Sequence, residues 1–150
     1  MLKYTHGNKN GTGAQMLVDV KISGSGSSGL VAFKILPQTN EKAGSRHSFA
    51  EEGSVSIGLD AGRIAHVLAV LRGDCKSTLG DKGVSVSENG KTAVIHVDET
   101  PDPFQGYAFH IVNKDDTSEA HGRILLNISE ALALRTAIEA SMGKIAFGNK

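Results

Sequence analysis

Hydrophobic and polar residues alternate along many short segments of the chain, and this two-residue period predicts strands with one buried face each. The clearest case is the segment 123–129, where Ile124, Leu126 and Ile128 share one side. The segment 107–112 alternates in the same way. The pattern predicts seven or eight strands, over residues 2–5, 16–22, 30–36, 54–59, 84–87, 92–97, 107–112 and 123–129.

At two places the period lengthens to three and four residues, which predicts an amphipathic helix. The helices are expected over residues 61–72 and 130–142. Each has a good N-capping residue before it and a glycine at its end. These four residues, in chain order, are Asp60, Gly73, Ser129 and Gly143.

The order of these elements is strands, helix, strands, helix, which indicates one strand-and-helix unit used twice. Short connections between neighbouring strands favour antiparallel pairing. Asn89-Gly90 is the strongest hairpin signal, because both residues tolerate positive φ. We therefore expect an α+β domain over residues 1–150, with one unit over about 1–73 and the other over about 74–150.

The composition narrows the possible classes of protein. Sixteen basic and sixteen acidic residues cancel, so net charge gives no support to nucleic-acid binding and only local patches remain to argue from. The single Cys75 excludes an internal disulfide and favours an intracellular protein. No apolar run approaches about 20 residues, and residues 1–8 lack the apolar core of a secretory signal, so we expect a cytoplasmic protein without a membrane anchor.

The second half of the chain resembles the Whirly single-stranded DNA-binding proteins, which are related to the coactivator called positive cofactor four. The resemblance is carried by Val112-Asn113, by 134–137 (Leu-Arg-Thr-Ala) in the last helix and by Met142-Gly143. The first half matches in outline, over 49–73. The family's Lys-Gly-Lys-Ala-Ala-Leu element would fall at 29–34, which here reads Gly-Leu-Val-Ala-Phe-Lys.

The resemblance implies a fold of two β-β-β-β-α repeats, with mainly antiparallel sheets and two helices packed together. It implies binding of single-stranded DNA in a homo-oligomer, a dimer or tetramer joined through the helices. The last helix fits such an assembly, because its alanines and leucines give more apolar surface than one sheet contact needs. Alanine is also simply a good helix former, which is the alternative interpretation.

Single strands are held by cations that follow the phosphates and by rings that stack on bases. Residues suited to these roles lie near predicted strand ends, on outer strand faces and in polar loops. The candidates are Lys21, Lys34, Arg46, His47, Phe49, Lys76, Lys82, Lys91, Tyr107 and Lys114. Each has an alternative structural role, because edge lysines also prevent aggregation and aromatic rings also fill cores. The segment 46–49 is the best local cluster, since charge and aromatic ring occur together in it.

Signals for an enzyme or a cofactor are weak. No pair among the six histidines has a spacing typical of metal ligands, and Cys75 has no CxxC partner. The segment 7–13 is rich in glycine but lacks the ending of a phosphate-binding loop. We therefore predict a non-enzymatic, cofactor-free protein that binds single-stranded DNA, or RNA, during replication, recombination or transcription. The alternative is an oligomeric structural or interaction protein that keeps the fold without binding nucleic acid.

Overall fold

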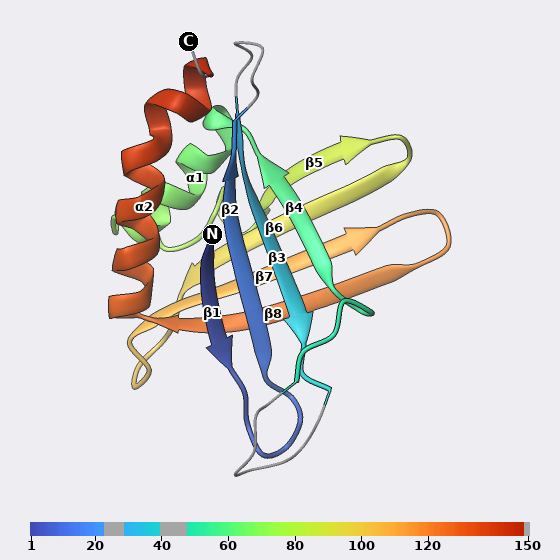
Figure 1. Ribbon diagram of the computed structural model, residues 1–150. Coiled ribbons are helices and arrows are strands. Elements are labelled where there is room, and N and C mark those ends of the chain that lie inside the picture. The colour runs from blue at the N-terminus through green and yellow to red at the C-terminus, as the bar shows by residue number, and fades with distance from the viewer. Residues whose placement is uncertain (23–28, 40–47, 149–150) are drawn as a thin grey trace.

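The computed structural model describes residues 1–22, 29–39 and 48–148 and shows two four-stranded antiparallel sheets, each followed by a helix (Figure 1). The strands of each sheet lie in chain order. The first sheet with its helix comprises β1 (Leu2–His6), β2 (Ala14–Lys21), β3 (Leu30–Pro37), β4 (Val55–Leu59) and α1 (Ala61–Leu71). The second comprises β5 (Val84–Glu88), β6 (Lys91–Glu99), β7 (Gly106–Lys114), β8 (Glu119–Asn127) and α2 (Ile128–Phe147). The predicted α+β class and the order of the elements are confirmed.

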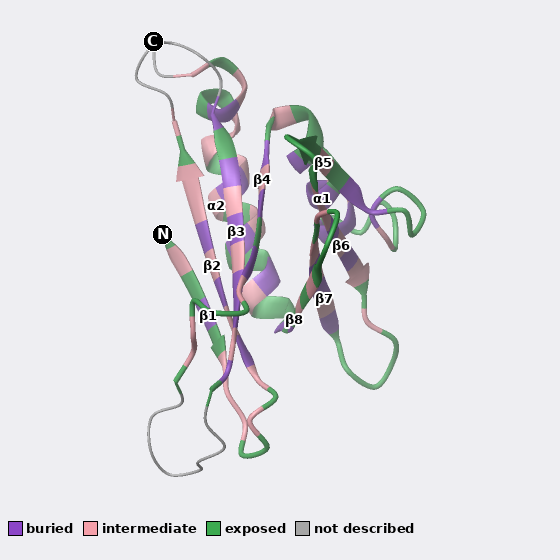
Figure 2. Cartoon of the chain, turned by 90° about the vertical axis from the view of Figure 1, so that its right-hand side faces the viewer, coloured by how far each residue is buried: buried purple, intermediate pink, exposed green. Residues whose placement is uncertain are grey.

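Each sheet buries one face, as the alternation predicts. In the first sheet Val18, Phe33 and Ile57 lie opposite one another on β2, β3 and β4, and all three are buried. In the second sheet Val97, Phe109 and Ile124 form the matching row on β6, β7 and β8. These inner faces and the two helices enclose one hydrophobic core, and the stretches of strand and helix that are buried in it are purple in Figure 2.

The two sheets meet at the centre of this core. The rings of Phe33 and Phe109 stack with centroids 6.3 Å apart. Next to them β8 passes close to β4 at Gly122, where an added Cβ would lie 2.5 Å from Val55 Cγ2 and 3.1 Å from Ile35 Cβ. Any side chain at Gly122 would push the sheets apart, so the crossing requires glycine at this position.

Both helices lie on the same side of the crossed sheets and contact each other. Asp60 is the N-cap of α1, as predicted, and its side chain accepts a hydrogen bond from the backbone N–H of Arg63. Arg72, after α1, reaches Glu139 of α2 at 2.5 Å, and Arg135 holds the other oxygen of the same carboxylate at 2.8 Å. Within the described residues, neither helix has the length and apolar character needed to cross a membrane.

The predicted limits of the last helix are wrong. Ser129 lies inside α2, because Asn127 and Glu130 form a capping box in which each side chain accepts from the other's backbone N–H. Gly143 does not end the helix, which continues to Phe147 and is capped by Gly148. The extra turn is stabilised by Ile145, which is fully buried.

We expect Phe109→Ala to lower the free energy of unfolding by about 3–5 kcal/mol, because it leaves a cavity where the two sheets meet. Phe104→Ala is the matched control, since the Phe104 side chain is 40% exposed. Chemical denaturation of both variants measures the difference, and similar losses from the two would contradict this account of the core.

Candidate nucleic-acid interface

A groove of about 810 Å³ lies where the second sheet extends past the edge strand β4 of the first. In Figure 1 the hairpins β5–β6 and β7–β8 project beyond β4, on the side away from the helices. One wall is formed by the outward-facing residues of β3 and β4, including Ala32 and Ser56. The other wall is the inner face of the projecting second sheet, formed by the cross-strand row Val86, Ala93, Asn113 and Ala120. We call this hollow the inter-sheet groove.

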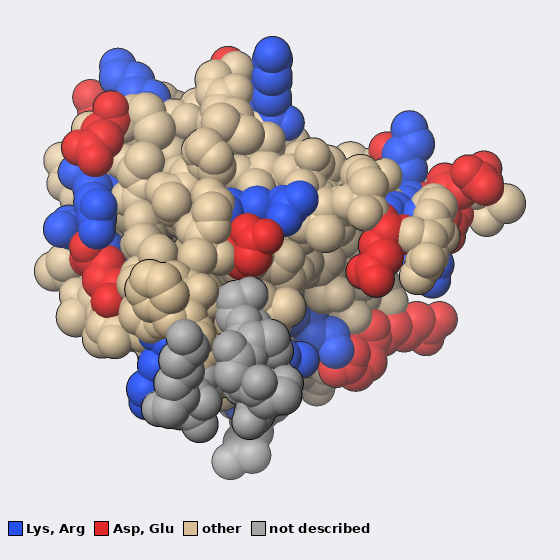
Figure 3. Space-filling model, turned by 90° about the horizontal axis from the view of Figure 1, so that it is seen from above, with Lys and Arg blue, Asp and Glu red and all other residues tan. Residues whose placement is uncertain are grey.

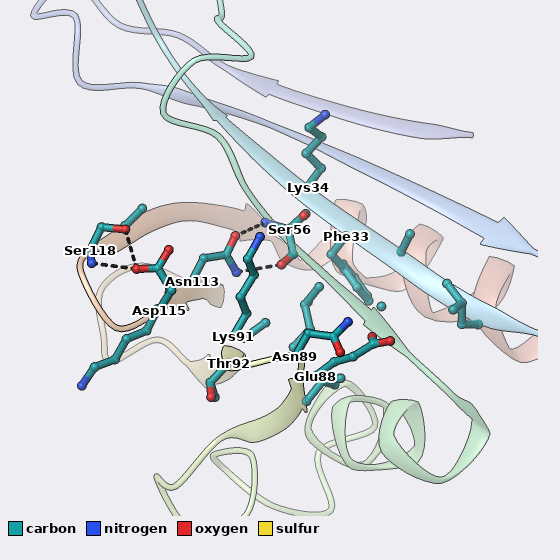
Figure 4. Close-up of a pocket in the computed structure, with 18 of the residues that line it drawn as sticks. Phe33, Lys34, Ser56, Glu88, Asn89, Lys91, Thr92, Asn113, Asp115 and Ser118 are labelled. Carbon is teal, nitrogen blue, oxygen red and sulfur yellow. Dashed lines mark hydrogen bonds between the residues drawn. The ribbon is translucent and has the colours of Figure 1, made fainter.

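Asn113 joins the two walls. Its Oδ1 accepts from the backbone N–H of Ser56 at 2.9 Å, and its Nδ2 donates to the Ser56 carbonyl at 2.8 Å (Figure 4). The side-chain amide thus pairs with β4 as a neighbouring strand would. The alternation of residues does not reveal this role, although Asn113 does place an amide in the inward series of β7, after the apolar Phe109 and Ile111.

Four of the predicted cation positions come together at the inter-sheet groove. They come from four different strands and are Lys21, Lys34, Lys91 and Lys114. Two carboxylates also line the groove, Glu88 and Asp115. Lys34 Nζ lies 2.5 Å from Glu51 Oε2, and because that carboxylate is 70% exposed the pair is weak enough to exchange for a phosphate. For the other three lysines, the described residues contain no ion-pair partner.

Asp115 is occupied by its own turn between β7 and β8. Its Oδ1 accepts from the backbone N–H groups of Thr117 at 2.9 Å and Ser118 at 2.8 Å, and from both hydroxyls at 3.1 Å. These hydrogen bonds, led by the Thr117 N–H, lower the pKa of Asp115 to about 2. The carboxylate stays ionised at neutral pH, but four donors offset its charge, so it repels a phosphate less than a free carboxylate would.

The structure places four of the remaining candidates away from the groove. Lys76 and Lys82 are exposed in the loop before β5, and Phe49 pairs with Gln38 beyond the end of β3. Tyr107 lies on the inner face of β7 and packs against the core. Arg46 and His47 lie outside the described residues.

Among the described residues that line the groove, no exposed aromatic ring is available to stack on a base. Phe33 is the aromatic residue among these lining residues, and it is fully buried. The inter-sheet groove is therefore suited to following a phosphate backbone with lysines and amides.

Charge on the rest of the surface is mixed. Figure 3 shows basic and acidic groups alternating on one face, and both kinds gather where the hairpins of the second sheet project. This pattern agrees with the zero net charge of the sequence. On this face the interspersed signs give no broad basic surface, so a phosphate backbone would depend on the local lysines of the groove.

Two crossed four-stranded antiparallel sheets, each followed by a helix, define the fold of the Whirly proteins. WHY3 from Arabidopsis thaliana superposes with a TM-score of 0.70 at 14% identity, covering 96% of this chain and 86% of that one. The plant transcriptional regulator PBF-2 gives a TM-score of 0.66 at 16% identity, with coverages of 96% and 80%. A guide-RNA-binding protein complex, solved bound to a guide RNA, gives 0.63 at 16% identity, with coverages of 95% and 89%.

At these identities the likeness is one of fold, and it confirms the expected Whirly-like architecture. No protein-family model matches the sequence, and no curated protein matches it either.

We expect Asn113→Ala to lower the free energy of unfolding by about 1–3 kcal/mol, because it leaves both Ser56 backbone groups without their partner. Lys114→Ala, at the adjacent position, is the control and should leave stability within about 0.5 kcal/mol of wild type. Urea denaturation compares the two variants. Equal stability of both would show that the amide bridge contributes nothing to the attachment of β4.

Proposed function

We propose that the protein binds single-stranded nucleic acid in the inter-sheet groove and acts without catalysis. The observation that carries this proposal is the convergence of Lys21, Lys34, Lys91 and Lys114 on one hollow between the sheets. These four ammonium groups outnumber the carboxylates beside them, which are Glu88, the Asp115 engaged by its own turn and the exposed Glu51 paired with Lys34, so the groove favours an anionic chain. The open groove lies along a sheet edge, where an extended strand fits without its bases being paired.

The comparisons support nucleic acid as the ligand class. One structure of the same fold was solved with a guide RNA bound, and another is described as a transcriptional regulator. Single-stranded DNA remains our preferred ligand and RNA the alternative, since phosphate contacts alone do not separate the two. Work on replication, recombination or transcription intermediates in the cytoplasm would suit such a protein.

Residues 1–22, 29–39 and 48–148 hold no group of three or more His, Cys, Asp or Glu side chains that could bind a metal ion. The lining of the groove offers lysines, amides and hydroxyls, which bind phosphates well. We therefore propose binding, with no reaction, as the activity of this site.

Binding is tested by fluorescence anisotropy with a labelled oligo-dT of about 30 nucleotides over a range of salt concentrations. We expect affinity to fall with salt, and duplex DNA to bind much less well. Replacing Lys34, Lys91 and Lys114 by alanine should lower the slope of log K against log salt by about 0.7 for each phosphate that the variant no longer neutralises.

The matched control is the double variant Lys76→Ala and Lys82→Ala, which removes exposed lysines outside the groove. It should keep most of the affinity and the salt slope of the wild type. If this control weakens binding as much as the groove variant, the site is elsewhere. If the wild type fails to bind at low salt and micromolar protein, the proposed function is wrong.

We also propose that the protein forms a homo-oligomer, a dimer or tetramer, through α2. This helix buries Leu134 and Ile138 against the core, yet Ile128, Leu132 and Phe147 are 53%, 55% and 70% exposed. A helix that is apolar on a second side gains stability from a further apolar partner. This surface, with the zero net charge, is also what favours the alternative of an oligomeric interaction protein without nucleic acid.

We expect Leu132→Lys to shift the protein toward monomer, because it would place a charge in the proposed contact. Leu79→Lys is the control, since Leu79 is 45% exposed in the loop before β5. Sedimentation velocity of both variants and of the wild type over a range of concentrations measures the mass. A monomeric wild type, or an unchanged mass for Leu132→Lys, would contradict assembly through α2.

A further inference from the structure

Three histidines form a row across the outer face of the second sheet, which is the side turned away from the core. His96, His110 and His121 come from β6, β7 and β8, and we call them the histidine row. His96 lies directly opposite His110, with ring centroids 5.8 Å apart. The rings of His110 and His121 are 5.1 Å apart, and His110 Nε2 lies 2.9 Å from His121 Nδ1.

The contact between His110 and His121 depends on protonation. A hydrogen bond between two imidazole nitrogens needs one donor and one acceptor, so at least one ring is neutral while it holds. When both rings take up protons, the acceptor disappears and the two cations repel each other. Burial, then His121, His96 and Arg123, lower the pKa of His110 from its ordinary value of 6.5.

The groups around the histidine row offer little compensation for added positive charge. Arg123 lies directly opposite His110 and has no ion-pair partner within the described residues. Asp98 of β6 lies on the same face, and Glu119 of β8 is 3.2 Å from His121. The remaining groups that face the row are the cation of Lys114 on β7, the uncharged Ser85 and Ser87 on β5, and a loop with Asp81 and Lys82 that packs Gly83 against His96.

While the three rings carry no charge, this face carries about as many carboxylates as cations. Three protons change that balance, because they add three positive charges beside Arg123 and leave the carboxylates as they were. An imidazolium ring donates two N–H groups and presents a flat face, so it binds phosphate oxygens and stacks on bases. The phosphates of a single strand carry regularly spaced negative charges, and these would compensate the positive charges of the protonated row.

We propose that this outer face is a second binding surface for single-stranded nucleic acid, which forms when His96, His110 and His121 take up protons. The surface is on the opposite side of the second sheet from the inter-sheet groove, and the two meet at the hairpin that carries Lys114. The inference extends the proposed function to a site with a different pH dependence. Failure of one site can therefore be told from failure of the other.

The test is anisotropy with oligo-dT, whose bases do not titrate in the relevant range, carrying a dye that is insensitive to pH. Between about pH 7.5 and about pH 5.5 we expect the affinity of the wild type to rise on the order of tenfold, because protonated rings bind further phosphates. The double variant His110→Gln and His121→Gln should keep the affinity near pH 7.5 and lose most of this rise. His66→Gln, on an exposed part of α1, is the control and should keep the rise.

A groove variant with only Lys34 and Lys91 replaced by alanine, which leaves Lys114 in place beside the histidine row, separates the two sites. It should bind weakly near pH 7.5 and still gain affinity on acidification. A wild type without the rise, or a double variant that keeps it, would overturn the second surface. Loss of binding near neutral pH alone would overturn the groove and leave this proposal standing.

Thermodynamic linkage between proton binding and nucleic-acid binding provides a second measurement. It is made on the wild type and so can still be made if the double variant fails to fold. If protonation strengthens binding, then bound oligo-dT must raise the pKa values of His110 and His121 to a corresponding extent. Titration of the imidazole signals by NMR, with and without oligo-dT at low salt, measures this directly on the wild type. His66 should titrate at the same pH in both, and unchanged values for His110 and His121 would also overturn the proposal.

Discussion

The packing of Phe33 against Phe109 is the contact on which the arrangement of the two sheets depends. The rings lie at the middle of β3 and β7, and every strand next to them contributes apolar side chains to the same core. Gly122 makes the contact possible, since β8 can approach Ile35 and Val55 closely only without a side chain there. The sheets therefore cross at one fixed place. On the side away from the helices, the hairpins of the second sheet extend past β4, the edge strand of the first sheet.

The inter-sheet groove follows from that crossing. Past β4 the inner face of the second sheet continues with Val86, Ala93, Asn113 and Ala120, small or polar residues where the core has large apolar ones. The opposite face of the same sheet carries the histidine row. One sheet thus offers a lysine-lined hollow on one side, where its hairpins extend beyond the first sheet, and the histidine row on the other side.

The sequence predicted the strands and the first helix well, because a two-residue period and a capping aspartate are local signals. It predicted the start of α2 two residues late, because Ser129 and Asn127 are both good caps and the choice depends on the reach of Glu130. Lys34 and Lys91 line the same groove only because of the way the two sheets cross, and no local sequence pattern contains that information. The alignment of His96, His110 and His121 likewise needed the registers of β6, β7 and β8.

The bridge from Asn113 to Ser56 has a consequence for solubility. An open strand edge is a template on which another chain can add a strand, and uncontrolled addition leads to aggregates. At Ser56 both backbone groups of β4 are already taken by an amide of the same chain, so strand addition there must first break two hydrogen bonds. This side chain protects the edge without covering it, which lets the hollow beside it stay open while cross-β stacking between copies is disfavoured.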